Sequence, residues 1–289
     1  MYRKQLLIAF LVFAIVSMAC SFTINIPVTE FKTGPTVTEE ISVPRIDDPN
    51  AIADVDLKFG AGKLSLKPGA DQALISGTIT YNVVRFKPKV TTSGTRITIS
   101  QDDTRINGLP NVRGDIKNDW DLMLSDSPMN LNITAGAYQG EYELGGLSLN
   151  SLHIIDGAAE THLSFSEPSR VQMSSIRYET GASSVKLIGL ANANFSELIF
   201  KSGAGDYTLD FSGVLQRNAT VNIETGLSSL TVLVPPGTSA RLSFEGGLTN
   251  VNVSGTWKAS GSDYILTGDG PMLTIVVKMG MGTLSLQNP

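Results

Sequence analysis

The residues of this chain that could do chemistry are few, and its histidines come first. His153 and His162 are the only two histidines in the sequence. Both fall in alternating segments that we expect to be strands, and each occupies an outward-facing position. They belong to different strands, and the chain has no His-x-x-x-His or Cys-x-x-Cys spacing. We therefore interpret both as solvated surface side chains and expect no metal site.

A pair of carboxylates and a glycine-rich segment are the other chemical candidates. Asp206 and Asp210 lie four residues apart on one predicted strand, so they point to the same side and could act as an acid–base pair. The segment GAGD at 203–206 is similar to calcium-binding and dinucleotide-binding glycine motifs. An alternating strand follows it where a dinucleotide loop needs a helix, and calcium-binding coils need an aspartate in every repeat. We interpret these carboxylates as solvated and expect no catalytic residue and no cofactor.

The N-terminus has the layout of an export signal. Arg3 and Lys4 precede an apolar run over residues 6–16, and the segment SMAC at 17–20 follows. The run is shorter than the roughly 18 residues that a transmembrane helix needs. Cys20, the only cysteine, resembles the lipid-bearing cysteine of a bacterial lipobox, which predicts a signal peptide over 1–19 and a lipid anchor. An ordinary secretory signal or an uncleaved anchor is the alternative.

Composition excludes one class of partner and favours one class of fold. Lys and Arg number 22 against 27 Asp and Glu, for a net charge of −5. An acidic chain without a basic patch does not suit nucleic acid. Hydrophobic residues make up 42% of the chain and charged residues 17%, with 28 glycines. Such a mixture favours pleated strands and tight turns over long helices.

A repeat dominates the chain from about residue 51. It is anchored on glycines that precede a short alternating apolar run, and the residues five and three positions before each glycine are apolar or aromatic. The anchors are Gly60, Gly136, Gly157, Gly181, Gly203, Gly226, Gly247 and Gly280. Apolar residues recur four and six positions after most anchors, with a shift of two at Gly136 and Gly157. Each unit reads strand, corner, strand, turn, and a corner needs either positive φ or close backbone approach.

The spacing of the anchors predicts the architecture. From Gly136 the intervals are about 21–24 residues, until a last interval that is about eleven residues longer. Units of this size cannot close a core alone, whereas stacked units can. We predict an all-β solenoid, with a β-sandwich as the alternative. The extra residues, about 257–268, should form a hairpin or loop, in which Trp257 and Tyr264 either offer a contact or cap the solenoid.

The sequence divides into four predicted segments. Residues 1–19 form the signal peptide, and residues 20–50, which are rich in proline, form a tether whose alternating pieces, such as 40–43, could pair as edge strands. Residues 51–128 form an N-terminal β region that joins the solenoid, and residues 129–289 form the β-solenoid domain.

Several segments resemble the toast-rack family. They are FKTGPT at 31–36, VDLKFGAG at 55–62, WDL at 120–122, SGAGDYTL at 202–209 and VPPGT at 234–238. The resemblance implies a β-solenoid. Related solenoids are adhesins, and others form the exported part of regulators of the response to cell-wall-active antibiotics. It implies no catalytic residues.

The combined expectation is a non-enzymatic bacterial envelope lipoprotein, anchored outside the cytoplasm through Cys20. Its rigid solenoid would present an adhesion or interaction surface to an unidentified envelope protein or glycan. Two alternatives stay open, an accessory regulator of the envelope-stress response and a glycan-active β-helix enzyme.

Overall fold

The computed structural model describes residues 28–48, 50–101, 109–112 and 115–288. The predicted signal peptide and Cys20 lie outside the described residues. The chain divides into two compact units, of which the smaller spans Met1–Lys32 and Arg105–Gly114. Its described part is a two-stranded parallel pair, β1 (Val28–Phe31) and β7 (Leu109–Val112). The larger unit, Thr33–Thr104 and Asp115–Pro289, carries the repeat.

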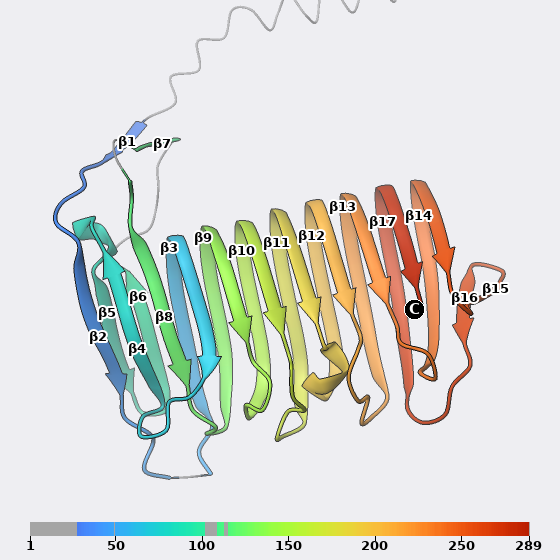
Figure 1. Cartoon of the computed structure of the whole chain (residues 1–289), viewed down its shortest axis with the longest axis horizontal. Coiled ribbons are helices and arrows are strands. Elements are labelled where there is room, and N and C mark those ends of the chain that lie inside the picture. The colour runs from blue at the N-terminus through green and yellow to red at the C-terminus, as the bar shows by residue number, and fades with distance from the viewer. Residues whose placement is uncertain (1–27, 49, 102–108, 113–114, 289) are drawn as a thin grey trace, which may run out of the picture. The chain divides into compact units, whose positions relative to one another are not determined.

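The repeat forms a row of long, bent, parallel strands (Figure 1), each with one anchor glycine near its middle. These strands are β3 (Ala53–Pro68), β9 (Met129–Glu143), β10 (Leu149–Ser164), β11 (Met173–Ile188), β12 (Phe195–Asp210), β13 (Ala219–Leu233), β14 (Ser239–Ser254) and β17 (Met272–Gln287). They belong to one open 15-stranded sheet. Apolar residues alternate with polar ones on both sides of each glycine, which suits a strand with one buried face. The predicted all-β solenoid is confirmed.

The core consists of the inward-facing side chains of stacked coils. Leu57 in β3, Ile133 in β9 and Ile154 in β10 lie one behind another in register and are almost fully buried. Aromatic rings continue this interior further along, where Phe200 contacts Tyr207 edge to face with ring centroids 5.1 Å apart. Each coil therefore contributes apolar area that only its neighbours cover.

The anchor glycines are required by close approach between coils and not by positive φ. A Cβ added to Gly181 would lie 2.4 Å from the carbonyl oxygen of Gly157, and one added to Gly203 would lie 2.6 Å from that of Gly181. Non-bonded atoms do not approach so closely. Positive φ occurs two residues later instead, at Gly62, Gly205 and Gly282. The glycines thus form one column through the stack.

The order of the last two coils differs from the chain order that simple stacking predicts. β17 pairs on one side with β13 and on the other with β14, both in parallel. The glycine column follows the same order, because Gly280 packs on the carbonyl of Gly226 and Gly247 packs on that of Gly280. The strand that comes last in sequence therefore lies inside the stack, and β14 forms its end.

The long last interval contains a hairpin, as predicted. β15 (Lys258–Ser260) and β16 (Asp263–Leu266) pair antiparallel, and β16 also pairs antiparallel with Ala240–Ser243 of β14. The hairpin therefore covers the outer edge of β14 along its first few residues only.

The other end of the stack is built from shorter strands. The second half of β3 pairs with β8 (Asn118–Leu124), and β4 (Ile75–Tyr81) and β2 (Val37–Val43) continue the sheet antiparallel. The first half of β3 pairs with β6 (Arg96–Gln101), followed by β5 (Pro88–Ser93). Two short 3₁₀ helices, η1 (Val84–Phe86) and η2 (Leu190–Ala193), are the helical elements among the described residues.

These strand pairings can be compared with the four segments predicted from the sequence. Residues 40–43 do form an edge strand, as part of β2, and bury Ile41 and Val43. β3 pairs along most of its length with β9, so one sheet crosses the predicted boundary at 128/129. Within the described residues, no helix has the length and apolar character that crossing a bilayer requires.

The glycine column generates a test of the fold. We expect Gly181→Ala to lower the free energy of unfolding by about 1–3 kcal/mol, as overpacking does, because its Cβ would meet a backbone carbonyl that cannot move without shifting the adjacent coil. Denaturant unfolding of the full chain measures this change.

Two matched substitutions control that test. Gly157→Ala should cost less, because its Cβ would lie 3.2 Å from the carbonyl oxygen of Gly136. Gly34→Ala should be neutral or slightly stabilising, since the nearest atom is 3.8 Å away and alanine restricts the unfolded chain. Equal losses for all three would contradict the close-approach explanation.

Candidate interaction surface

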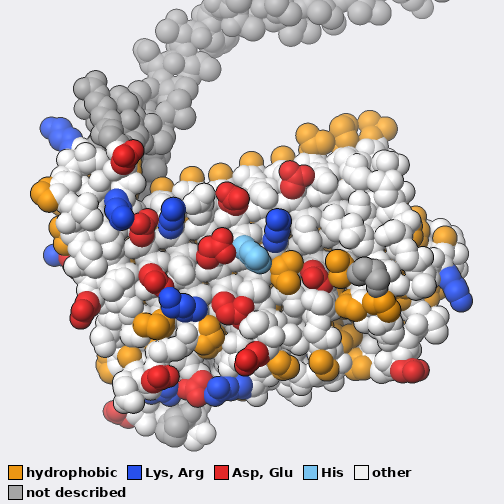
Figure 2. Space-filling model, viewed as in Figure 1, with side chains coloured by type: hydrophobic (Ala, Val, Ile, Leu, Met, Phe, Trp, Pro, Cys, Tyr) orange, Lys and Arg blue, Asp and Glu red, His pale blue; other side chains and the backbone are white. Residues whose placement is uncertain are grey.

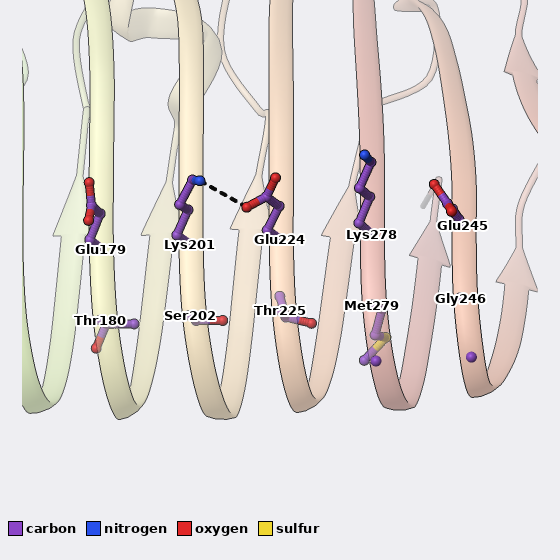
Figure 3. A pocket seen from close by; sticks show the side chains of 12 residues that line it. Glu179, Thr180, Lys201, Ser202, Glu224, Thr225, Glu245, Gly246, Lys278 and Met279 are labelled. Atoms are coloured by element: carbon purple, nitrogen blue, oxygen red, sulfur yellow. Dashed lines mark ion pairs between the residues drawn. The ribbon is translucent and has the colours of Figure 1, made fainter.

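A groove runs across five adjacent strands beside the glycine column (Figure 3). It has a volume of about 700 Å³ and lies on β11, β12, β13, β17 and β14. It is lined by the residues one and two positions before each anchor glycine, together with two of the glycines. These residues are Glu179, Thr180, Lys201, Ser202, Glu224, Thr225, Lys278, Met279, Glu245, Gly246, Gly247 and Gly280.

The charged residues of the groove alternate in sign from strand to strand. Glu179 pairs in register with Lys201, Lys201 with Glu224, Glu224 with Lys278, and Lys278 with Glu245. Lys201 Nζ lies 2.9 Å from a carboxylate oxygen of Glu224. The hydrogen bond and the charge of Lys201 lower the pKa of the Glu224 carboxyl, to which the charge of Lys278 adds. We call this row the charge ladder.

The charge ladder depends on the unexpected strand order. If β14 followed β13 directly, Glu245 would stand opposite Glu224, and like charges directly opposite destabilise a pair of strands. With β17 between them, Lys278 separates the two glutamates (Figure 3). Because these side chains are exposed or half-buried, the ladder contributes modestly to overall stability. It nevertheless favours this order of strands over the alternative.

A buried carboxylate lies in the coils next to the groove. Asp156 accepts hydrogen bonds from the hydroxyls of Tyr178, at 2.8 Å, and Tyr138, at 3.3 Å, and also from Thr180 and Ser183. Burial raises the pKa of Asp156, and the hydroxyl donors oppose that rise in part. Because its acceptor positions are filled by side chains of this chain, we assign it a structural role.

An apolar ridge follows the corner on the other side of the glycine column. The residue after each anchor glycine is alanine in β3 and β9–β12, but Leu227 in β13, Met281 in β17 and Leu248 in β14. These three side chains pair in register and are 57%, 46% and 75% exposed, respectively. Figure 2 shows apolar side chains along the upper edge of the molecule, larger at the C-terminal end. We call these three residues the apolar ridge.

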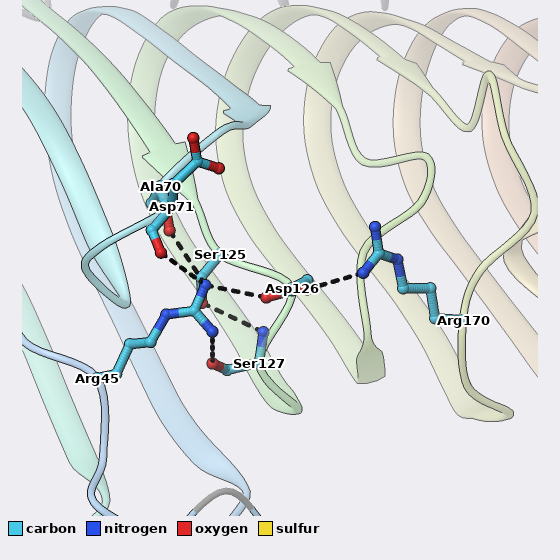
Figure 4. A network of polar contacts seen from close by, with 7 residues as sticks. All are labelled: Arg45, Ala70, Asp71, Ser125, Asp126, Ser127 and Arg170. Carbon is cyan, nitrogen blue, oxygen red and sulfur yellow. Dashed lines mark hydrogen bonds and ion pairs between the residues drawn. The ribbon is translucent and has the colours of Figure 1, made fainter.

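A second polar cluster ties loops at the opposite end of the strands (Figure 4). Asp126, after β8, pairs with Arg45 at 3.0 Å and with Arg170 at 2.8 Å. The hydrogen bond from Arg45 lowers the pKa of the Asp126 carboxyl, with the charges of both arginines. Arg45 also donates to the backbone carbonyls of Ala70 and Asp71. These contacts join the loops around β2, β8 and β11.

The aromatic residues of the hairpin, Trp257 and Tyr264, do not form one exposed surface. Trp257 is only 9% exposed, and within the described structure its indole nitrogen has no hydrogen-bond partner. Tyr264 is half-buried in β16, opposite Leu242 of β14. The burial of Trp257 favours the capping alternative over a contact role. The contact role of Tyr264 stays a prediction.

The polar residues that the sequence singled out are not brought together into a site. His153 and His162 lie in different halves of β10, 4.0 Å from Glu179 and 3.9 Å from Glu141, respectively. Asp210 accepts a hydrogen bond from the backbone of Ser212, and Asp206 lies exposed in the same strand. In the part of the chain that the structure describes, no three His, Cys, Asp or Glu side chains gather in a metal-binding arrangement.

The family of the chain follows from its sequence. The sequence model of the N-terminal domain of toast_rack (DUF2154) matches residues 32–188. The chain therefore belongs to the toast-rack family, as its motifs indicated. None of the curated proteins matches it.

Three solved structures that the chain matches come from species of Clostridium, Bacteroides and Parabacteroides. A putative cell adhesion protein from Clostridium sporogenes is 20% identical, with 88% of this chain and all of that chain (100%) covered and a TM-score of 0.48. A putative adhesin from Bacteroides fragilis is 13% identical, with 90% and 100% covered and a TM-score of 0.49. A putative lipid binding protein from Parabacteroides distasonis is 10% identical, with 90% and 100% covered and a TM-score of 0.40.

The charge ladder predicts a salt-dependent effect on stability. Lys278→Glu should lower Tm by about 2 °C at low salt, because it places three glutamates side by side. The loss should shrink in concentrated salt, which screens exposed charges. The triple variant with Glu224→Lys and Glu245→Lys restores alternation at these three positions and should recover only part of the loss, because it replaces the ion pair of Lys201 with a like-charge contact. Thermal unfolding measures all three chains, and a loss that is unchanged by salt would contradict the electrostatic account.

Asp156 predicts a pH effect of the opposite sign to that of a salt-bridged carboxylate. Because its pKa is raised in the folded chain, its burial cost is relieved as the pH falls through that raised value toward its ordinary value near 3.8. Asp156→Asn lacks this gain. The free energy of unfolding of the unmodified chain, minus that of the variant, should therefore increase from pH 7 to about pH 4.5 in denaturant unfolding. A constant difference would mean that Asp156 titrates normally.

Proposed function

We propose that this protein is an exported, lipid-anchored, non-enzymatic toast-rack protein that binds another protein of the cell envelope. The binding surface consists of the charge ladder and the apolar ridge, which border the same glycine column. The observation that carries the proposal is the placement of Leu227, Met281 and Leu248, large and exposed, next to an alternating row of charges.

This combination suits a protein partner better than a glycan. Protein interfaces place apolar side chains at their centre, with methionine enriched, and polar groups around them. Aromatic rings supply large contact areas in many binding sites, but the apolar ridge is aliphatic. The register of parallel strands holds ridge and ladder at fixed spacing, so little ordering is needed on binding. An envelope glycan is the alternative partner.

The N-terminal sequence supports the proposed lipid anchor at Cys20. A basic start, an apolar run and SMAC at 17–20 support cleavage before Cys20 and acylation of its thiol. Two or three acyl chains hold a protein firmly on a membrane. The tether was predicted over residues 20–50. Because β2 takes Val37–Val43 into the sheet, the proposed tether is the part of that segment ahead of β2.

In-cell photocrosslinking tests the binding surface. A photoreactive amino acid at Leu227 or Met281 should give a discrete crosslinked band containing a second protein. The matched control is Val214, which is 61% exposed in a loop outside the groove, and it should give no such band. Leu227→Ser combined with Met281→Ser should abolish partner recovery, whereas Val214→Ser should not.

Two results would overturn the proposal. Equal crosslinking at Leu227 and Val214 would remove the ridge from any specific contact. Crosslinking of the ridge to polysaccharide would replace the protein partner with a glycan.

Cys20→Ser tests the anchor separately. The unmodified protein should incorporate an alkyne-labelled fatty acid and fractionate with membranes. Cys20→Ser should lose the label and be at least tenfold depleted from the membrane fraction, because acyl chains supply the anchoring energy. Mutation of the exposed Ser229 to Ala controls for handling, and a label that survives Cys20→Ser would rule out this site of acylation.

A further inference from the structure

The end of the stack formed by β14 is incompletely covered. The repeat pattern places Leu242, Phe244, Val251 and Val253 on the inward face of this coil. Leu242 is fully buried, Phe244 and Val251 are half-exposed, and Val253 is 43% exposed. The corresponding residues of β13 and β17 are buried. The second half of β14 therefore lacks the next coil that covers each of the others.

The outer backbone edge of this segment is also free. The hairpin strand β16 pairs with Ala240–Ser243 only, and the backbone N–H of Phe244 reaches Ser262. From Gly246 to Ser254, β14 pairs with β17 on its inner side, and no described strand pairs with its outer side. One set of alternating N–H and C=O groups along this stretch consequently faces outward without a strand partner, as in any sheet edge.

The outer edge of β14 lacks the charged residues and prolines that keep exposed sheet edges from pairing with other strands. Residues 246–254, GGLTNVNVS, contain no charged residue and no proline. The two outer strands at the opposite end differ, because β2 carries Glu39 and Glu40 and β5 carries Pro88 and Lys89. Charges and prolines on an edge prevent pairing with another strand. The β14 edge is thus the one of these three that is open to strand addition.

We propose that residues 248–254 of β14 pair antiparallel with the same residues of a second copy of this chain, around a twofold axis at Val251. A twofold axis perpendicular to a sheet makes two identical edges antiparallel and keeps their inward faces on one side. This register places Val251 opposite itself, Thr249 opposite Val253, and Asn250 opposite Asn252. β-branched pairs and amide pairs of this kind stabilise antiparallel strands.

Self-pairing suits this edge because it opposes no like charges. A charged edge meeting its own copy would place some charges of equal sign near one another, at a cost, whereas this one contains none between Gly246 and Ser254. Pairing also gives Val251 and Val253 apolar neighbours in place of water. The pairing segment shares Leu248 with the apolar ridge, but Leu227 lies on β13, two strands inward, so a change at Leu227 tests the partner-binding surface alone.

Sedimentation velocity of the purified full-length protein, in one detergent for all variants, tests the proposal. The unmodified chain should sediment as a dimer. Asn250→Lys with Asn252→Lys should shift it to monomer by at least tenfold in Kd, because each introduced lysine faces a lysine of the other copy. Asn250→Lys with Asn252→Glu should restore the dimer, because unlike charges then face one another in the proposed register.

The chain offers a matched control at the same positions of an interior strand. Ser229 and Thr231 of β13 align with Asn250 and Asn252 through β17, so Ser229→Lys with Thr231→Lys should leave the dimer intact. Leu227→Ser should also leave it intact, which separates this proposal from the partner-binding one.

Three outcomes would overturn the proposal. The unmodified chain could be monomeric at all concentrations, or the paired lysines at 250 and 252 could leave the dimer unchanged. Loss of assembly on Thr38→Lys, in the exposed edge strand β2, would instead show head-to-tail contact between opposite ends.

Discussion

The whole stack depends on contact between a glycine Cα and the carbonyl oxygen of the coil beside it. At Gly181 and Gly203 no side chain fits, since its first carbon would overlap that oxygen. At these corners, coils can therefore approach to the spacing of parallel strands only because glycine lies above glycine. This requirement fixes the register of every coil against its neighbours. Everything that forms a row in this protein, from the buried apolar columns to the charge ladder, follows from that shared register.

Register converts single residues into continuous surfaces. Residues at the same position before or after the glycine lie side by side in successive strands. Their types, whether the same or different from strand to strand, therefore decide the character of the whole row. In β11 to β14 the position two before the glycine alternates in charge, and the position after it changes from alanine to Leu227, Met281 and Leu248. The same mechanism places Asp156 within reach of hydroxyls from two flanking strands. A surface of this kind is rigid, because the backbone of one strand cannot move without shifting the adjacent coils.

The sequence predicted the features that every coil shares, and it did not predict the features in which single coils differ. Alternation with period two and the anchor glycines gave the strands, the corners and the buried residues, because each coil follows the same local rule. The order of β17 and β14 could not be read from that rule, since any two coils with the same pattern are interchangeable in it. The signal that distinguishes them is Lys278, whose positive charge separates Glu224 from Glu245 only when β17 lies between β13 and β14. Trp257 shows a second limit, because an aromatic residue in a predicted hairpin has the same pattern whether it caps a core or faces a partner.

The position of β17 also bears on how the protein reaches its final state. Residues of β14 precede those of β17 in the chain, yet β17 separates β14 from β13. As the chain emerges, coils as far as β13 can add one upon another in the order of their synthesis. β14 cannot then settle in its final place, because its neighbour has not yet appeared, and any early docking onto β13 must be undone. β14 therefore reaches its final place only after residues 272–287 of β17 have become available, whereas the earlier coils can assemble progressively.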